Sequence, residues 1–144
     1  MIVLVGVDES DCSKAAVEFV KKATWSKDSR FLIVSASPPV FLNPGEATAP
    51  GAIAQVIAAQ ESFHRGLAEQ AAGELQKAGL KVEARMVSAD PRTALEEAAR
   101  QEKADLLIVG SHGRSGISKL LLGSVASHVI SHAPCNVLVV KRHS

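Results

Sequence analysis

The chain has 144 residues, of which 47% are hydrophobic and 22% charged, and its formal net charge at pH 7 is +1. This composition is typical of one globular domain with a buried core, here expected to span residues 1–144, and it excludes a disordered chain. A net charge near zero argues against binding nucleic acid or a membrane surface by bulk charge, and an aromatic content of 3% argues against a base-stacking platform.

Targeting and redox signals are weak in this sequence. No apolar run approaches the roughly 20 residues that a membrane-spanning helix needs. Residues 1–7 are apolar, but no basic region accompanies them and they run directly into Asp8 and Glu9, which does not support a signal peptide. The two cysteines, Cys12 and Cys135, are too few for a disulfide framework. We therefore expect a cytoplasmic protein.

Apolar strands and amphipathic helices alternate along the first part of the chain. Continuous β-branched and leucine runs predict strands buried on both faces at 2–7 and 31–36. Apolar residues at helical spacing predict a helix over 10–25, with a serine or aspartate as its N-cap. Prolines then end the second strand, and the proline- and glycine-rich segment 40–51 predicts an irregular surface loop.

A long helix is expected next, over residues 52–78. Gly66 and Gly73 lie inside it and each cost about 1 kcal/mol relative to alanine, so we expect this helix to bend or to start late. Its apolar residues recur on one side. They are Ile53, Val56, Ile57, Phe63, Leu67, Ala71 and Leu75.

The second part of the chain continues the alternation. Residues 80–88 alternate apolar and charged, which is typical of a strand near a sheet edge. The pair at 90–91, aspartate then proline, predicts the start of a helix. An apolar strand over 105–109, a helix within 118–132 and a strand over 136–140 complete the chain.

This alternation predicts a three-layer α/β sandwich of the Rossmann-like or flavodoxin-like type, with a five-stranded parallel sheet and right-handed crossovers. We expect the strand order 3-2-1-4-5, because the third strand resembles an edge strand and the first and fourth resemble central ones. Ligands of such sheets lie beyond the carboxyl ends of the strands where the order reverses, here between strands one and four. Asp8 and Gly110 end those two strands, so the predicted site lies between them.

A glycine cluster follows the fourth strand. Residues 110–116 have the sequence Gly-Ser-His-Gly-Arg-Ser-Gly, and Gly123 and Ser124 come shortly after. Glycines let a backbone approach a ligand closely, and the intervening hydroxyl, imidazole and guanidinium groups are donors for an anion. The cluster thus predicts a phosphate cradle. It is neither a Walker A motif nor the glycine fingerprint of dinucleotide-binding enzymes, which disfavours a P-loop NTPase and a dehydrogenase.

The whole span has the form G-x2-G-x9-G followed by Ser or Thr, and with it the sequence resembles the universal stress protein family, in its ATP-binding branch. The resemblance covers nearly all of the chain and is weakest over 39–78. Ala89 departs from the glycine that is more usual in the family. The matching segments are 7–10, 89–91, 104–110, 123–126 and 133–140.

The resemblance implies an ATP site at the predicted reversal of strand order. The cluster and the residues after Gly123 would hold the triphosphate and ribose. Asp8 would accept hydrogen bonds from the ribose hydroxyls or help to hold Mg²⁺, and the backbone of Ala36 would contact the adenine edge. The implied cofactor-binding positions are Val7, Asp8, Ala36, Gly110, Ser111, His112, Gly113, Arg114, Ser115, Gly116, Gly123, Ser124 and Val125.

Several roles remain open at this stage. His112 either contacts phosphate or shapes the turn, and Arg114 either neutralises phosphate charge or points into solvent. His128 and His132 have the spacing of a metal-binding pair, but no acidic or cysteine ligand is evident beside them, so we interpret them as an exposed helix face.

The last strand, 136–140, is uniformly apolar at an expected sheet edge, which invites pairing with another chain, and we predict a homodimer through it. The expected function is a nucleotide-dependent regulatory module of the stress response. A slow ATPase or phosphotransferase and a partner-binding protein without nucleotide are the alternatives. No general base is evident near the cluster, so no catalytic residue is assigned, and ATP, ADP, AMP and a cyclic nucleotide are all candidate ligands.

Overall fold

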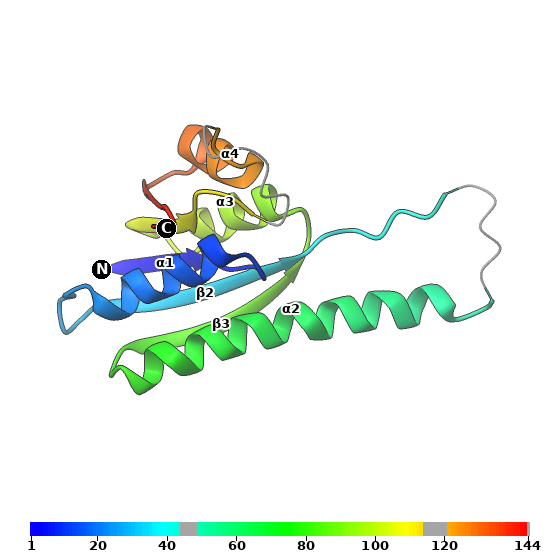
Figure 1. Ribbon diagram of the computed structural model, residues 1–144, viewed down its shortest axis with the longest axis horizontal. Coiled ribbons are helices and arrows are strands. Elements are labelled where there is room, and N and C mark those ends of the chain that lie inside the picture. Colours follow the sequence, from blue (N-terminus) through cyan, green and yellow to red (C-terminus); the bar gives the residue numbers. More distant parts are fainter. Residues whose placement is uncertain (44–48, 114–120, 144) are drawn as a thin grey trace.

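The computed structural model describes residues 1–43, 49–113 and 121–143. Within these ranges, strands and helices alternate along the chain (Figure 1). They are β1 (Ile2–Gly6), α1 (Asp11–Lys22), β2 (Arg30–Ser37), α2 (Ala52–Lys77), β3 (Lys81–Ser88), α3 (Pro91–Gln101), β4 (Leu106–Gly110), α4 (Ser124–His132) and β5 (Asn136–Val140).

The five strands form one sheet in the order β3-β2-β1-β4-β5, and each neighbouring pair is parallel. Leu4 in the middle of β1 lies opposite Leu32 of β2 and Leu107 of β4, so β1 is enclosed on both sides. The predicted fold class and strand order are therefore confirmed. Because all strands run the same way, their carboxyl ends share one edge of the sheet, and the order reverses between β1 and β4.

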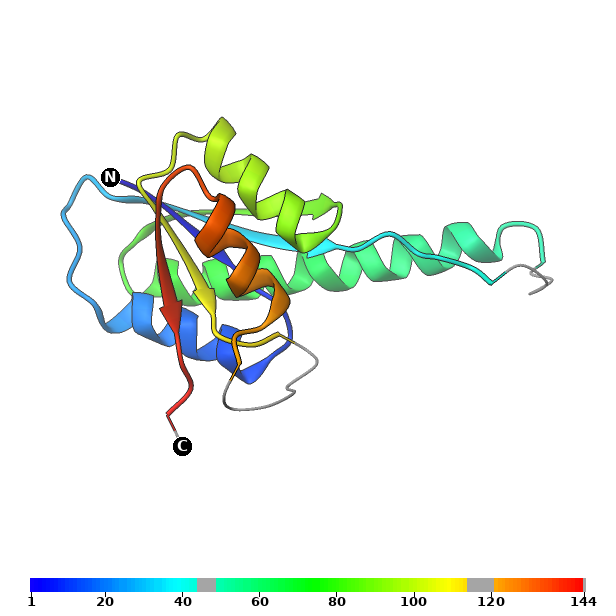
Figure 2. The ribbon, with the colours of Figure 1, turned by 90° about the horizontal axis from the view of Figure 1, so that it is seen from above.

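Helices cover both faces of the sheet, and each face has its own hydrophobic core. Val3 and Val5 of β1 pack with residues of α1 and α2, whereas Leu4 between them packs with residues of α3 and α4. This alternation follows from the two-residue period of a strand. Figures 1 and 2 show α3 and α4 together on one side of the sheet. The two cores enclose β1 and β4 from both faces, and so position the strand ends that border the predicted site.

Small differences from the predicted boundaries have identifiable causes. α1 ends at Lys22, before Trp25, because Ala23 is extended. Trp25 instead anchors the following turn: its indole N–H donates to the Val20 carbonyl at 2.8 Å, and its ring meets Phe31 edge-on at a centroid distance of 5.2 Å.

Helix α2 runs without interruption through Gly66 and Gly73, so the expected late start is wrong. Its first turns reach beyond the sheet, and segment 38–43 runs out in the same direction (Figures 1 and 2). The expected apolar side is exposed at Ile53, Val56 and Ile57, because the sheet does not extend far enough to cover them. The buried face lies nearer the C-terminal end and consists of His64, Ala68, Ala71, Ala72 and Leu75.

None of the helices in the described ranges is long and apolar enough to cross a membrane.

Candidate functional site

A cavity of about 250 Å³ lies at the carboxyl ends of the central strands, where the strand order reverses. This volume lies just below the range of roughly 300–1,000 Å³ that is typical of small-molecule sites. The cavity is bordered by the ends of β1, β2 and β4, by the first turns of α1, α3 and α4, and by α2. Eight predicted site residues line it: Val7, Asp8, Ala36, Gly110, His112, Gly113, Ser124 and Val125.

Asp8 is held in the tight connection between β1 and α1. Its backbone N–H donates to the Ser13 hydroxyl at 2.9 Å, and its Oδ1 accepts from the Ser10 N–H at 2.8 Å. Ser10 in turn caps α1 by accepting from the Ser13 N–H at 3.1 Å. Asp8 therefore supports the helix start and also presents a carboxylate to the cavity. Among the described lining residues it is the only acidic side chain.

Gly113 faces this carboxylate. A Cβ atom at position 113 would lie 3.1 Å from Asp8 Oδ2, closer than ordinary van der Waals contact. The missing side chain thus keeps a space open between the Asp8 carboxylate and the backbone of the loop that follows β4. Such a space suits the close approach of a ligand to backbone N–H groups.

The first turn of α4 lies against the same loop. The Gly123 N–H donates to the Ser111 carbonyl at 2.8 Å, and a Cβ on Gly123 would lie 3.1 Å from the Cα atom of His112. Gly123 also has no side chain to cap the helix. The first N–H groups of α4, at Ser124 and Val125, therefore lie beside the cavity as a partial positive charge that favours an anion.

The His112 ring bridges the two ends of the connection from β4 to α4. Its Nδ1 lies 3.0 Å from the Ser111 hydroxyl, and its Nε2 bonds to the Leu121 carbonyl. A carbonyl only accepts, which assigns the proton to Nε2 and makes the Ser111 hydroxyl the donor to Nδ1. Both ring nitrogens are thus engaged within the protein. This arrangement favours the turn-shaping role of His112 over a phosphate contact.

Ser111 lies beneath the cavity rather than in its wall. It is 2% exposed, and its N–H donates to the Val140 carbonyl of β5 at 2.9 Å. Its hydroxyl is also 3.6 Å from the Cys12 sulfur. The residue therefore ties the glycine cluster to α1 and β5. Arg114, Ser115 and Gly116, the other predicted members of the cluster, lie outside the described residues.

Gly110 serves packing between β4 and α1. A Cβ on this residue would lie 2.7 Å from the backbone carbonyl carbon of Cys12, a contact that real structures do not show. We expect Gly110→Ala to lower the free energy of unfolding by about 1–3 kcal/mol, because the backbone of α1 has to move. Gly66→Ala is the matched control: it lies within α2 with open space around it, and it should stabilise by roughly 0.5–1 kcal/mol. Urea denaturation measures both, and a wild-type midpoint for Gly110→Ala would contradict the packing role.

The backbone of Ala36 points past the end of β1. The Val7 N–H donates to the Val34 carbonyl at 2.9 Å, so the backbone groups of Val34 face β1. Every second residue of a strand directs its backbone N–H and C=O to the same side, so those of Ala36 also point to the side of β1. β1 ends before it reaches the level of Ala36. The N–H and C=O of Ala36 are therefore directed toward the cavity. Ala89, which departs from the family pattern, does not line the cavity among the described residues.

The opposite wall is apolar and comes from α3, through Pro91 and Leu95. Asp90 caps this helix, and hydrogen bonding from the Arg92 guanidinium lowers the pKa of its carboxyl group.

His64 is a lining residue that the sequence analysis missed. It lies on α2, is 2% exposed, and its Nδ1 is 3.0 Å from the Ser35 hydroxyl. The signal was present, because residue 64 continues the helical spacing of Ala68, Ala71 and Leu75. Hydrophobic periodicity alone does not identify this residue, because histidine is polar.

The two histidines of α4, His128 and His132, contact each other and an acidic side chain of α3. Their rings stack at a centroid distance of 4.2 Å, and His128 Nε2 lies 3.0 Å from Glu96 Oε2. The expectation of no acidic neighbour is therefore wrong. Hydrogen bonds from Arg100 and then from His128 lower the pKa of Glu96. Across the described ranges, no group of three or more His, Cys, Asp or Glu side chains is arranged so that it could hold a metal ion.

Comparisons with known proteins agree with one another. The family model described as "Universal stress protein family" matches residues 1–141. A universal stress protein of Thermus aquaticus is 32% identical over 139 residues, covering 96% of this chain and 97% of that protein. Universal stress protein MJ0531 of Methanocaldococcus jannaschii is 44% identical over 64 residues, which cover 44% of this chain and 38% of that protein's length.

Solved structures are similar as well. UspA from Lactobacillus plantarum superposes with a TM-score of 0.76 at 21% identity, covering 97% of each chain, and so shares the fold. A universal stress protein solved in complex with cAMP is 31% identical with a TM-score of 0.63, covering 97% of this chain and 95% of that one. An Arabidopsis thaliana family protein with AMP bound has a TM-score of 0.71 at 19% identity, covering 100% and 93%.

Proposed function

Because this chain belongs to the universal stress protein family, we propose that it binds ATP in the cavity between β1 and β4 and that nucleotide-dependent regulation in the stress response is its function. The observation that carries this proposal is the space at Gly113, where a Cβ would lie 3.1 Å from Asp8 Oδ2. The cavity thereby places a carboxylate, which can accept hydrogen bonds from ligand hydroxyl groups, beside a glycine loop and a helix N-terminus, which can bind phosphate.

Each part of a nucleotide has a complementary part of the cavity in this proposal. The adenine lies between the Ala36 backbone and the apolar wall at Leu95, and the ribose hydroxyls donate to Asp8. The phosphates accept from the backbone of Gly113 and from the first N–H groups of α4. Arg114, Ser115 and Gly116 belong to the proposed phosphate site through the family motif.

The remaining predicted residues support this site. Val7 borders the cavity beside Asp8, while Gly110, Ser111, His112 and Gly123 hold the cluster in place. Mg²⁺ fits the donor set, since it prefers few carboxylates together with phosphate oxygens and water. Asp8 would hold it indirectly, and the ion would neutralise phosphate charge.

The cAMP complex of a 31% identical family protein supports an adenine nucleotide as the ligand class. The choice of ATP rests on the presence of two anion-binding elements at the cavity, the backbone at Gly113 and the first N–H groups of α4. Binding is favoured over turnover, because Asp8 is the one acidic side chain of the described lining and its Oδ1 is engaged with the Ser10 N–H.

Isothermal titration calorimetry tests this function directly. We expect ATP to bind at one site per chain, more tightly with Mg²⁺ than with EDTA, and ADP, AMP and cAMP to compete for the same site. A single-turnover assay should show hydrolysis no faster than in an Asp8→Ala variant. If none of the four nucleotides bound, the proposal would be refuted. Fast turnover would show that the protein is an ATPase and not a regulatory module.

The sheet edge at β5 supports a further part of the proposal, a homodimer. β5 is the outermost strand beside β4, and charged residues follow it only at Lys141 and Arg142. An apolar edge of this kind pairs readily with a second copy. Sedimentation velocity should detect this dimer.

A further inference from the structure

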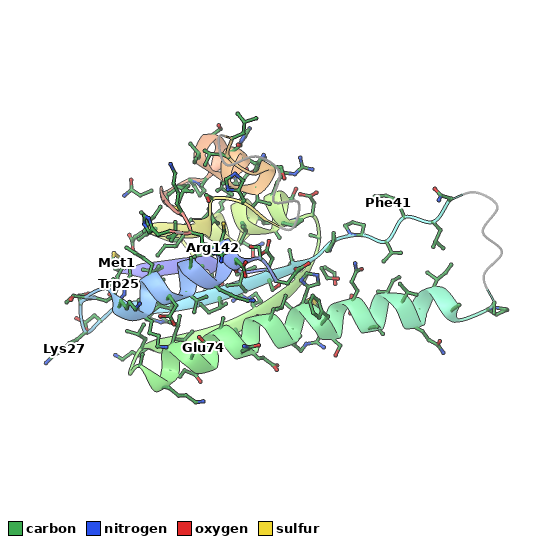
Figure 3. The ribbon with its side chains drawn as sticks, viewed as in Figure 1. Met1, Trp25, Lys27, Phe41, Glu74 and Arg142 are labelled. Carbon is green, nitrogen blue, oxygen red and sulfur yellow. The ribbon has the colours of Figure 1, made fainter. Side chains whose placement is uncertain are left out.

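The N-terminal half of α2 and the extended segment before it form an arm, defined here as residues 38–43 and 49–63. The arm reaches beyond the sheet (Figure 1), and Figure 3 shows Phe41 on it far from the core. Residues 53–59 are exposed at every position around the helix. The large apolar side chains exposed on the arm are Phe41, Leu42, Ile53, Val56, Ile57 and Phe63. Such a concentration of exposed apolar groups marks an interaction surface.

The buried face of α2 continues along this arm. In the C-terminal half, His64, Ala68 and Leu75 face the protein interior. Gln60 and Ile57 precede His64 by four and seven residues, and Ile53 precedes Ile57 by four, so all four positions share one face of the helix. The exposed isoleucines therefore occupy the face that the same helix buries elsewhere, as expected of an amphipathic helix whose partner surface is missing.

The charge of the arm selects among partners. No lysine or arginine occurs between Arg30 and Arg65, and Glu61 is the one charged residue within 38–43 and 49–63. Its carboxylate lies at the base of the arm and accepts from the Ser88 hydroxyl at 2.6 Å. Helices that lie on membranes, and surfaces that bind nucleic acid, carry basic side chains. A two-fold contact places a surface against its own copy, and the part of the arm formed by residues 38–43 and 49–60, which carries no charge, meets no like charge there.

The exposed area is adequate for such a contact. With aromatic side chains each offering on the order of 200 Å² and the aliphatic ones somewhat less, the six residues expose roughly 500 Å² per copy. Pairing two arms would then bury on the order of 1,000 Å², the lower bound for a specific interface. Alanines at 54, 58 and 59 allow the helices to approach closely.

We propose that two copies of this chain associate through their arms, with the N-terminal halves of α2 packed antiparallel about a two-fold axis. β5 lies at the opposite edge of the sheet from β3 and its neighbour α2, so this interface is separate from the one at β5. Where both interfaces form, the assembly has two kinds of two-fold contact, as in a tetramer with dihedral symmetry.

Light scattering coupled to size-exclusion chromatography tests the arm contact with the full chain. Val56 is 52% exposed in the middle of the exposed turns, and Ile130 is 49% exposed on α4, outside the arm. We expect Val56→Asp to halve the mass of the wild-type assembly and Ile130→Asp to leave it unchanged. Equal masses for the wild type and Val56→Asp would overturn the proposal.

A second measurement controls for the alternative that aspartate unfolds the helix locally. Val56→Cys, near the proposed two-fold axis, should form a disulfide-linked dimer under mild oxidation, whereas Ile130→Cys should not. Equal cross-linking of the two variants would count against the arm contact. A wild-type monomer that instead sediments with phosphatidylcholine vesicles would show that lipid covers the arm, and would also overturn the proposal.

Discussion

Replacing Gly113 by valine should abolish ATP binding while the protein remains folded. The Cβ of valine would lie 3.1 Å from Asp8 Oδ2, and its two methyl groups would extend into the cradle that we assign to phosphate. We expect an affinity loss of at least ~100-fold, which corresponds to about 3 kcal/mol. Calorimetric titration of the purified variant with ATP and Mg²⁺ measures this loss.

The fold should tolerate this change for two reasons. The atom nearest to the new Cβ is the end of a flexible side chain, and Gly113 is not among the glycines with positive φ, which are Gly51 and Gly79 in the described residues. Thermal unfolding should therefore occur within a few degrees of the wild type. Gly66→Ala, remote from the cavity, is the control and should bind ATP normally. Wild-type affinity in Gly113→Val would mean that the phosphates lie elsewhere.

Asp8→Asn should weaken ATP binding by roughly 10- to 100-fold, since a hydrogen bond to a charged acceptor contributes about 1.5–3 kcal/mol. Asparagine keeps an oxygen that can accept from the Ser10 N–H, as Asp8 Oδ1 does at 2.8 Å, so the start of α1 should remain intact. The charge of the carboxylate is the main property that changes. Circular dichroism should confirm an unaltered helix content.

The two proposed roles of Asp8 can be separated by varying the ligand and the metal. If Asp8 accepts from the ribose hydroxyls, the substitution should have little effect on the binding of 2′,3′-dideoxy-ATP. If Asp8 holds Mg²⁺ through water, the effect should instead disappear in EDTA. An equal loss under all of these conditions would show that Asp8 acts through the loop structure and not by contacting the ligand.

The strand order could be predicted because β1 and β4 are continuous apolar runs, whereas β3 alternates apolar and charged residues. Local pattern thus distinguished central strands from an edge strand. The location of the cavity followed from this order, since the carboxyl ends of parallel strands share one edge. The positions of Asp8 and Gly110 in the sequence then sufficed to place them at the reversal.

The roles of individual side chains were harder to predict, because each depends on a distant neighbour. Gly110 belongs to the ligand motif, yet its closest contacts are with Cys12, which the sequence pattern does not reveal. The orientation of His112 depends on the Leu121 carbonyl, nine residues later. Helical spacing in α2 identified an apolar face, but the exposure of Ile53 depends on where the sheet ends.

Nuclear magnetic resonance of the isotopically labelled protein, titrated with ATP and Mg²⁺, tests the central claim most directly. If the nucleotide lies between β1 and β4, the backbone amide signals of Ala36, Gly113, Ser124 and Val125 should shift on titration, and the shifts should saturate as the site fills. Residues at the opposite end of the sheet, such as Ala104 and Asn136, should not shift. Shifts confined to that opposite end, or no shifts at all, would contradict the proposed nucleotide site.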